Sequence, residues 1–380
     1  MQNKSKKIFG KIKHEGLINA IQNYVNKEAT LKKELKIIRD YHLINEEERK
    51  QQKEFKFECE EKISIITPVY NREDCIHRCI ESITAQAEET EHWIVNDGST
   101  DATLSIIQQY ADKYPHIHVL TYERNAGVSA ARNAAIRKCT GDYVLFLDSD
   151  DYLEKDGIEK LLVLAETKAL DMVCGRYKTV NEIGDVLDIS ETNIFLNKMN
   201  NNIITGEKYL SNNGLVPAIW IYFYSKMYLD EIELRFKNFR DNGCYEDCDF
   251  VIRAIYFCKK IMKSDIVFYN YLQRKNSQKY RREAKLSYNI VEIADELIKF
   301  GENNVQGKEC RIFFDKYIDF LYAQSVQRII QLKCNADIFK EIDFKDKISQ
   351  RLFKSQIKKY RIKKGWTQRK LAETLLLSDS

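Results

Sequence analysis

Prolines, long apolar runs and paired-cysteine motifs are scarce or absent in this sequence. Only three prolines occur in 380 residues, so no long proline-rich linker is present. No apolar run reaches about 18 residues, the length that indicates a membrane-spanning helix. The N-terminal residues MQNKSKKIFGKIKHEG lack the continuous apolar core of a signal peptide. We therefore expect a cytoplasmic chain without a membrane span.

The charge balance and the cysteine spacing argue against a nucleic-acid-binding protein and a zinc-binding protein. The formal net charge of +4 is too small to indicate a nucleic-acid partner by itself, and we expect none. None of the ten cysteines forms a Cys-x-x-Cys pair. Cys75 and Cys79 are four residues apart, as are Cys244 and Cys248, which is a helical spacing without the partners of a zinc site. We expect most of the cysteines to be reduced, buried thiols.

Strands and helices alternate from residue 63 onward. Runs rich in β-branched and aromatic residues predict strands at 63–70, 92–99, 116–123 and 142–150. Between them, apolar residues at helical spacing predict helices at 75–86, 101–114 and 128–139. This alternation predicts an α/β fold with a mainly parallel sheet. Such sheets bind ligands at the carboxyl ends of their strands, where this sequence places four polar clusters: TPVYNRE, NDGSTD, ERNAGVSAARN and DSDD.

The two ends of the chain have a helical pattern. Residues 1–60 are rich in Lys and Glu, with apolar residues at loose helical intervals that predict one or two amphipathic helices. A further helix is predicted at 246–260, and the chain beyond 285 has a helical pattern throughout.

The segment GDYVLFLDSDD (141–151) concentrates negative charge at the end of an apolar strand. At roughly 5 Å and an effective dielectric constant of about 20, each pair among Asp148, Asp150 and Asp151 costs on the order of 3 kcal/mol. A divalent cation would offset that repulsion, because Mg²⁺ and Mn²⁺ take oxygen ligands. Side chains two residues apart in an extended chain point the same way, so Asp148 and Asp150 can face one ligand together.

Other interpretations of the acidic segment either remain open or are contradicted by the residue type at a required position. A solvated acidic turn is one, with Asp150 or Asp151 as the N-cap of the next helix. An EF-hand loop is excluded, because Tyr152 and Leu153 stand where an oxygen ligand and a glycine are needed. An Asp-x-Asp phosphatase expects Thr or Val where this chain has Tyr152, and it leaves the upstream clusters unexplained.

Each upstream cluster has a functional and a structural interpretation. In VNDGSTD, Asp97 can accept a hydrogen bond from a base, or the segment can be an ordinary turn and helix cap. TPVYN offers backbone carbonyls beside Pro68 and an aromatic face at Tyr70. Arg132 lies near the start of a helix, where it can meet phosphates.

In this order, TPVYNRE, VNDGSTD, NAGVSAARNAAI and GDYVLFLDSDDYL resemble the nucleotide-binding half of family 2 glycosyltransferases. The resemblance covers residues 63–155 and continues more loosely through AIWIYFYSKMYLDEIELRF, YEDCDFVIRA and FYNYLQRKNSQ. It implies the GT-A fold, a Rossmann-like, mainly parallel sheet flanked by helices. The implied division is a GT-A domain at 61–275, with a nucleotide-sugar half (61–160) and an acceptor half (161–275), between helical extensions at 1–60 and 276–380.

The resemblance also implies roles for the donor-side residues. Asp97 corresponds to the base-recognising Asp, and Asn96 departs from the family's frequent Asp without changing that contact. Asp148 corresponds to the ribose contact, and Asp150 to the ligand of the Mn²⁺ or Mg²⁺ that bridges the diphosphate. Pro68, Tyr70, Arg132 and Ser149 are the other expected nucleotide-sugar contacts. Asp151 is expected to support the site or to cap a helix.

On the acceptor side, GCYEDCDF (243–250) resembles the family's Glu-Asp block, which implies that Asp247 is the general base and Glu246 its neighbour. The structural alternative is a helix N-terminus enriched in acids because the macrodipole favours them. Trp220 matches a family aromatic in the acceptor half, where an aromatic face suits the apolar side of a sugar ring, or it packs in the core. Arg274 is a further candidate for the diphosphate. A base separate from the leaving group implies transfer with inversion.

The C-terminal tail is strongly basic. Residues 345–371 hold eleven Lys or Arg and one acid, with apolar residues interleaved. Such a helix can lie on an anionic membrane surface, or it can pack on the body of the protein. YRIKKGWTQRKLAETLLLS also resembles the first part of a helix-turn-helix domain, but the chain stops where the recognition helix would begin, so we do not expect DNA binding.

Together with the acidic segment, the resemblance implies a metal-dependent, inverting glycosyltransferase of the type that builds bacterial cell-surface polysaccharides. Its donor would be a nucleotide-diphosphate sugar, with UDP expected, and its acceptor a glycan or lipid-linked saccharide. Peripheral contact with the inner face of the membrane and a homodimer remain open. The alternatives are a non-catalytic nucleotide-sugar-binding scaffold of the same fold and the phosphatase.

Overall fold

The structure is a computed structural model that describes residues 62–86, 90–189, 201–212, 215–239, 245–274, 285–331 and 347–364. The chain divides into two units, Met1–Glu60 and Glu61–Ser380, and every described residue belongs to the second. The helices predicted in residues 1–60 and the helix-turn-helix-like residues from 365 onward therefore lie outside the described residues.

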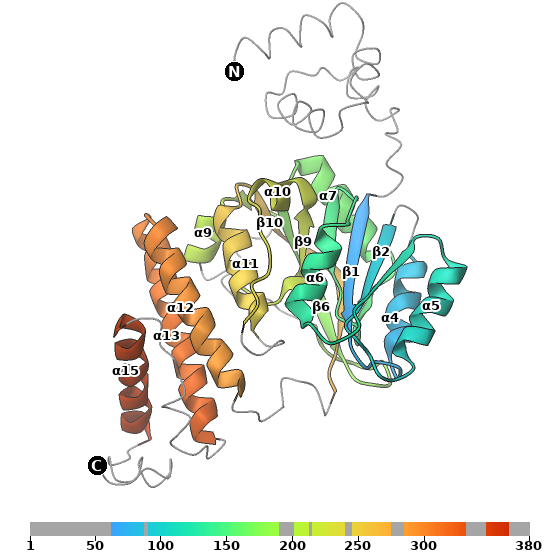
Figure 1. The fold of residues 1–380 in the computed structure, drawn as a ribbon. Helices are drawn as coiled ribbons and strands as arrows, with labels where there is room; N and C mark the ends of the chain where they lie inside the picture. Colours follow the sequence, from blue (N-terminus) through green and yellow to red (C-terminus); the bar gives the residue numbers. More distant parts are fainter. Residues whose placement is uncertain are drawn as a thin grey trace, which may run out of the picture. The chain divides into compact units, whose positions relative to one another are not determined.

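A single mixed sheet forms the centre of this unit (Figure 1). Its spatial order is β3-β2-β1-β4-β9-β6-β10-β5, and β7 and β8 pair with β6 and β10. The strands are β1 (Ile63–Val69), β2 (Thr90–Asn96), β3 (Ile117–Thr121), β4 (Tyr143–Phe146), β5 (Tyr152–Leu153), β6 (Met172–Val180), β7 (Val186–Ile189), β8 (Ile203–Ile204), β9 (Tyr222–Ser225) and β10 (Ile261–Leu272). The four strands predicted between residues 63 and 150 are confirmed.

Strand direction brings the functional segments to one edge of the sheet. β1 is parallel to β2 and β4, and β2 is parallel to β3. β9 is antiparallel to both β4 and β6, so β6 runs in the same direction as β4, and β10 is parallel to β6. The carboxyl ends of β1, β2, β4, β6 and β10 therefore lie at the same edge. The predicted α/β fold with a mainly parallel sheet is confirmed.

Helices pack on the faces of the sheet and on one another (Figure 1). They are α4 (Ile76–Thr84), α5 (Thr103–Lys113), α6 (Val128–Ile136), α7 (Gly157–Lys168), α9 (Gly206–Ser211), α10 (Lys226–Glu231), α11 (Glu246–Phe257), α12 (Lys285–Asn304), α13 (Lys308–Gln331), α15 (Lys347–Lys363) and the 3₁₀-helix η1 (Ile219–Ile221). The helices predicted between residues 75 and 139 and at 246–260 are confirmed.

The central strands are buried over their whole length. All seven residues of β1 (ISIITPV) and all four of β4 (YVLF) are buried, as their β-branched and aromatic composition favours. Gly141 precedes β4 and lets it approach β1, because a Cβ there would lie 2.7 Å from the Ser64 amide nitrogen. β4 therefore enters the core directly, and its end carries the acidic segment to the edge of the sheet.

The helix α4 shows how the amphipathic pattern is used. Ile76, Cys79, Ile80 and Ile83 are buried, at the spacing of one helix face. The expectation for the cysteines is confirmed where the structure describes them: Cys75, Cys79, Cys139, Cys174, Cys248, Cys258 and Cys310 are free and buried.

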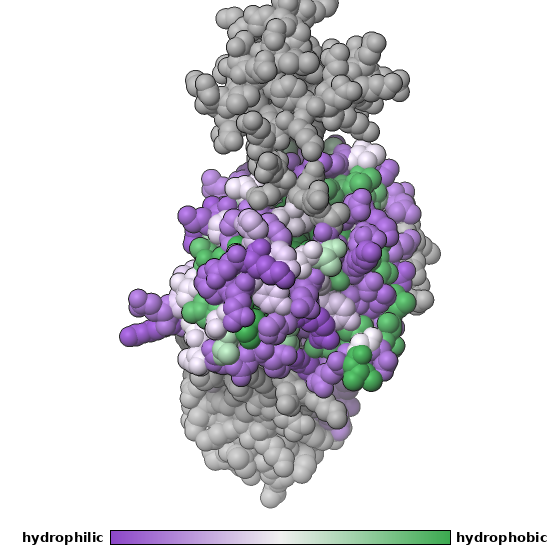
Figure 2. Space-filling view, turned by 90° about the vertical axis from the view of Figure 1, so that its right-hand side faces the viewer, coloured by the Kyte–Doolittle hydropathy of each residue, from purple (hydrophilic) through white to green (hydrophobic). Residues whose placement is uncertain are grey.

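Seen from the side of α4 and α5, most of the coloured surface is hydrophilic, with hydrophobic residues in small separate groups (Figure 2).

The C-terminal helices pack on the sheet domain. α12 and α13 form a pair that contacts α11 and α9, and α15 lies against α13 (Figure 1). Ile357 and Tyr360 of α15 pack against the core, and the Lys359 ammonium lies 3.0 Å from the Asp319 carboxylate of α13. Among the residues that the structure describes, no helix is long and apolar enough to cross a membrane.

Candidate functional site

Four predicted site residues meet at the carboxyl edge of the sheet. Asp97 follows β2, Asp148 follows β4, Arg132 lies on α6, and Asp247 lies in the first turn of α11. α6 begins after the loop that follows β3, so its side chains reach the same edge. The sequence predicts one composite site from these residues, and the structure brings Arg132, Asp148 and Asp247 into direct contact.

The buried Arg132 side chain joins the two halves of the site. Its Nη1 donates to Glu246 Oε1 at 2.7 Å and to Asp247 Oδ1 at 3.0 Å. Its Nη2 donates to Asp148 Oδ1 at 3.2 Å. The guanidinium also lies over the Phe236 ring, 5.2 Å from the centroid. Arg132 is predicted to meet phosphates, and here one guanidinium is shared by three carboxylates.

The three carboxylates around Arg132 stabilise the positive charge of its guanidinium. Burial would lower the pKa of the Arg132 guanidinium, but Asp247, Glu246 and Asp148 raise it well above its ordinary value. Arg132 therefore stays charged at every working pH.

The two aspartates that contact Arg132 have raised pKa values. Burial raises the pKa of Asp247 well above its usual value, and Arg132 opposes that shift. The pKa of Asp148 is raised by burial and by Asp150, again against Arg132. Arg132 thus counteracts the desolvation of both carboxylates, and each of them would gain from a further cation.

The three aspartates of the acidic segment have different environments. Asp151 is buried and turned toward β10, where its Oδ2 accepts from the Tyr269 hydroxyl at 2.7 Å and its Oδ1 from the Leu272 amide at 2.7 Å. It does not cap a helix, because the next helix, α7, begins at Gly157 with Asp156 at its N-cap. The alternative interpretation, in which Asp150 or Asp151 caps that helix, is therefore wrong. Burial raises the pKa of Asp151 well above its usual value, with further contributions from Asp150 and Asp148.

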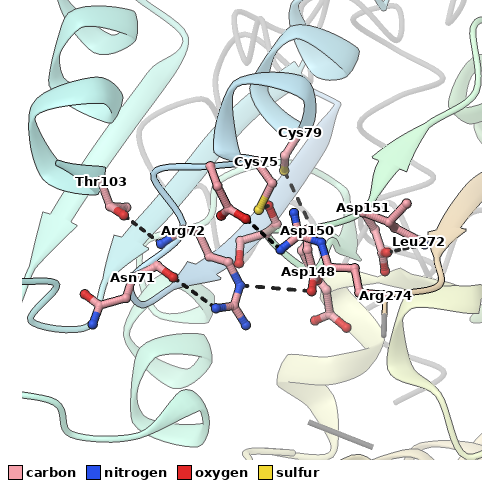
Figure 3. A network of polar contacts seen from close by, with 12 residues as sticks. Asn71, Arg72, Cys75, Cys79, Thr103, Asp148, Asp150, Asp151, Leu272 and Arg274 are labelled. Atoms are coloured by element: carbon pink, nitrogen blue, oxygen red, sulfur yellow. Dashed lines mark hydrogen bonds and ion pairs between the residues drawn. The ribbon is translucent and has the colours of Figure 1, made fainter. Parts of the chain in front are cut away.

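Asp150 makes a longer polar contact than Asp148 and Asp151 do. Its Oδ2 lies 4.0 Å from Arg72 Nε, and its side chain is 26% exposed. Arg274, the further diphosphate candidate, pairs with Asp74 at 3.0 Å. Figure 3 shows Arg72 and Arg274 close to the Asp148–Asp150 segment, while Asp151 points to Leu272.

The donor set suits a cation that also binds substrate. In the described part of the chain, no three His, Cys, Asp or Glu side chains converge as a metal site. Mg²⁺ and Mn²⁺ commonly take one or two protein carboxylates and complete their shell with substrate phosphates and water. Asp150, with a partly exposed carboxylate and a long contact to Arg72, fits such a cation.

Asp97 shapes the loop before α6. Its two carboxylate oxygens accept from the amides of Ala126 and Gly127, at 2.7 and 2.9 Å. Gly98 adopts φ +73°, and a Cβ there would lie 2.7 Å from the Arg124 backbone carbon, so a glycine is required beside this loop. The base contact predicted for Asp97 would use the remaining lone pairs of these oxygens.

The other predicted donor residues lie around the end of β1. Pro68 is in β1, and Tyr70, which follows it, is 43% exposed. Ser149 is buried, and its carbonyl accepts from the Cys75 thiol at 3.8 Å. The Asp148 carbonyl likewise accepts from Cys79 at 3.9 Å. One face of α4 thus holds the backbone of the acidic segment.

The two predicted acceptor residues are mostly buried. The Trp220 ring stacks on Tyr269 and Tyr271, with centroids 4.5 and 5.5 Å apart, and meets Tyr177 edge-on. Trp220 therefore packs against side chains of β6 and β10 whether or not an acceptor touches it. Glu246 is 8% exposed, and its Oε2 is buried without a hydrogen-bond partner in the described chain.

Two residues near the acidic segment are not among those predicted from the sequence. The Tyr269 hydroxyl accepts from the Asp148 amide at 3.2 Å and donates to Asp151, so it braces both acids. Tyr269 lies more than a hundred residues later in a strand of many aromatics, and no local pattern singles it out. Arg72 could have been predicted from the sequence, because it lies in the TPVYNRE cluster that is expected at the same edge of the sheet.

Residues 64–228 match the family model described as "Glycosyl transferase family 2". Glycosyltransferase GlyA of Streptococcus pneumoniae serotype 4 is 29% identical over 249 residues, which are 64% of this chain and 35% of that protein. An uncharacterized glycosyltransferase of Bacillus subtilis, EpsJ, is 31% identical over 218 residues, 57% of this chain and 62% of that one. The chain thus spans less than two thirds of either relative.

The fold also has solved counterparts. The S. aureus TarS fragment 1-349, in complex with UDP-GlcNAc, superposes with a TM-score of 0.55 at 18% identity. The match covers 81% of this chain and 93% of the fragment. At this identity the likeness concerns the fold alone, and it confirms the predicted GT-A architecture.

Proposed function

From the premise that residues 64–228 form a glycosyl transferase family 2 domain with the GT-A fold, we propose that the chain transfers a sugar from a nucleotide-diphosphate sugar to a saccharide acceptor. The observation that carries the proposal is the contact of Arg132 with Asp148 and Asp247. It joins the acidic segment expected to hold the donor to the carboxylate expected to activate the acceptor.

The donor is proposed to be a UDP-sugar. TarS, the protein with the related fold, was solved with UDP-GlcNAc. Asp97 lies beside the loop before α6 and would receive the base, and Tyr70 would offer its exposed ring. Asp148 would meet the ribose, together with Pro68 and Ser149 along the ends of β1 and β4.

Asp150 would hold a divalent cation at the diphosphate. Bound there, Mn²⁺ or Mg²⁺ supplies Lewis-acid stabilisation of the negative charge on the leaving diphosphate. Arg72 and Arg274 lie on the same side and add fixed positive charge near these oxygens.

Asp247 would take the proton of the attacking acceptor hydroxyl. Its carboxylate is 21% exposed, so it can reach a hydroxyl while Arg132 holds its other side. A general base contributes about 10²- to 10⁴-fold to the rate. Because the base is separate from the leaving diphosphate, the proposed displacement is single and inverts the anomeric carbon. Glu246 Oε2 and an edge of Trp220 are the proposed acceptor contacts.

The acceptor is proposed to be a glycan or lipid-linked saccharide of cell-surface polysaccharide assembly. The exposed lysines of α15 support contact with an anionic membrane surface, where a lipid-linked acceptor would lie. α15 turns Ile357 and Tyr360 to the protein, so this contact would be electrostatic rather than an insertion of its apolar residues.

Calorimetry with UDP-sugars and GDP-sugars tests the donor proposal. We expect one UDP-sugar to bind with Mn²⁺, binding to be lost with chelator, and Asp150→Ala to abolish the metal-dependent part. The Asp230→Ala variant, which removes a carboxylate that pairs with Lys226 outside the site, should bind as the wild type does. Binding without transfer to any acceptor would favour the non-catalytic scaffold, and phosphate release that depends on Asp148 would favour the phosphatase.

A further inference from the structure

Tyr245, the residue immediately before Glu246 and Asp247, has an unusual backbone conformation. It is the N-cap of α11 with φ 71° and ψ 0°, in the left-handed region. Non-glycine residues rarely adopt this conformation, and it persists only when the surrounding structure holds it. Its side chain makes no capping hydrogen bond to the helix. The conformation therefore needs support from another element.

That support comes from the C-terminal helical region. Arg328, on α13, donates from Nη2 to the Tyr245 hydroxyl oxygen at 2.8 Å. The same guanidinium lies over the Tyr245 ring, 5.3 Å from its centroid. A hydrogen bond and a cation–π contact from one side chain fix both the position and the orientation of the ring.

The clamp acts on the start of the helix that carries the base. Asp247 is two residues beyond Tyr245, and the first turn of α11 directs its carboxylate to Arg132. A rotation about the Tyr245 backbone would move Glu246 and Asp247 together. α11 thus begins between two arginines, Arg132 from the sheet side and Arg328 from α13.

α13 is a rigid support for this contact. Phe314, Leu321 and Tyr322 are buried in its interface with the rest of the unit, each at most 1% exposed. Lys237 adds a second connection, because its ammonium lies 2.7 Å from Glu296 of α12 and 3.9 Å from Asp249 of α11. The helical region is therefore joined to α11 beside the base and along its first turns.

We propose that Arg328 is a positioning residue for the transfer reaction: by clamping Tyr245 it aims the Asp247 carboxylate at the acceptor hydroxyl. The C-terminal helices would thereby contribute to catalysis. This inference rests on the proposed function, because it takes Asp247 to be the base.

The test compares two arginines of the same helix. Arg328→Ala removes the clamp. Arg311→Ala removes an arginine that lies about 25 Å from Arg328 along α13 and donates to the Val305 carbonyl. We expect Arg328→Ala to lower kcat by about 10- to 100-fold with an unchanged KM for the donor, because a displacement near 1 Å can cost that much. Arg311→Ala should keep the wild-type kcat. Equal losses in both variants would overturn the proposal.

A double-mutant cycle isolates the contact. Tyr245→Phe removes the hydroxyl acceptor and keeps the ring, so its loss in kcat should be smaller than that of Arg328→Ala. The double variant should be no slower than Arg328→Ala alone, and additive losses would contradict the clamp. Arg328→Lys keeps the charge and should restore part of kcat, which also serves if Arg328→Ala does not fold.

Hydrogen–deuterium exchange separates this inference from the proposed function. The peptide that covers α11 should exchange faster in Arg328→Ala than in Arg311→Ala or the wild type. Faster exchange in a protein whose wild type transfers no sugar would refute the function and leave the clamp. Wild-type turnover with unchanged exchange and kcat in Arg328→Ala would refute the clamp and leave the function.

Discussion

Arg132 and Asp247 are 115 residues apart in the chain, and their side chains meet at 3.0 Å. Arg132 comes from α6, beside the parallel strands, and Asp247 from the first turn of α11. The contact lets a single buried guanidinium hold the carboxylate proposed as the base and, at 3.2 Å, the first aspartate of the acidic segment. Stability, turnover and pH dependence should therefore all respond to changes in this cluster.

Replacing Arg132 by Met should destabilise the protein, more at pH 8 than at pH 5. The change leaves Asp148, Glu246 and Asp247 without their shared cation, and removing one partner of a buried ion pair costs roughly 3–5 kcal/mol. Partial exposure of Asp148 and Asp247 places the expected loss at the lower end. The pKa values of Asp148 and Asp247, which burial already raises, rise further without the arginine, so these two aspartates protonate as the pH falls and their repulsion disappears. Thermal melting at both pH values measures the effect, and an equal loss at both would contradict it; Arg132→Lys should recover part of the stability.

Replacing Asp247 by Asn should separate turnover from binding. The amide keeps the size of the side chain and cannot take a proton, so kcat should fall by about 10²- to 10⁴-fold. The donor dissociation constant should not change, because Asp148, the proposed nucleotide contact, pairs with the other terminal nitrogen of Arg132. Steady-state kinetics and calorimetry on the same preparation measure both quantities. Near-normal turnover would remove Asp247 from the role of base.

The acid limb of the kcat–pH profile should lie above the ordinary range of an aspartate. Burial raises the pKa of Asp247, and the base works only as the carboxylate, so activity is lost as the pH falls through this raised value. An unperturbed Asp would place the limb near pH 4. Rates measured at saturating substrate from about pH 4.5 to 9, in buffers of constant ionic strength, locate it. A flat profile over this whole range would show that Asp247 does not limit the reaction.

Reversing exposed charges on α15 should weaken binding to anionic vesicles. Lys354, Lys358 and Lys363 are exposed, and each lysine near such a surface contributes about 1 kcal/mol. Lys354→Glu, Lys358→Glu and Lys363→Glu together should lower the partition coefficient at least roughly 100-fold in co-sedimentation with phosphatidylserine vesicles. The same three reversals at Lys155, Lys160 and Lys168, which are exposed at and around α7, serve as the control. Equal losses, or no binding by the wild type, would refute the membrane contact.

The local patterns of the sequence were sufficient to predict the fold and to predict that the candidate site residues lie at one edge of the sheet. β-branched runs such as ISIITPV and helical spacings such as Ile76–Cys79–Ile80–Ile83 report burial directly, because periodicity depends only on neighbouring residues. Parallel strands then bring their carboxyl ends to one edge, so the sequence alone predicts that the clusters around Asp97 and Asp148 lie together.

Contacts between distant segments were decided by the tertiary structure. No sequence pattern indicates that Tyr269 braces the acidic segment, that Asp151 turns away to β10, or that Arg328 clamps Tyr245. These pairings depend on how β10 and α13 pack against the edge of the sheet, which no local spacing encodes. Residue types at the ends of strands thus determined which chemistry is available, and the packing of the later elements decided how each charged group is paired and aimed.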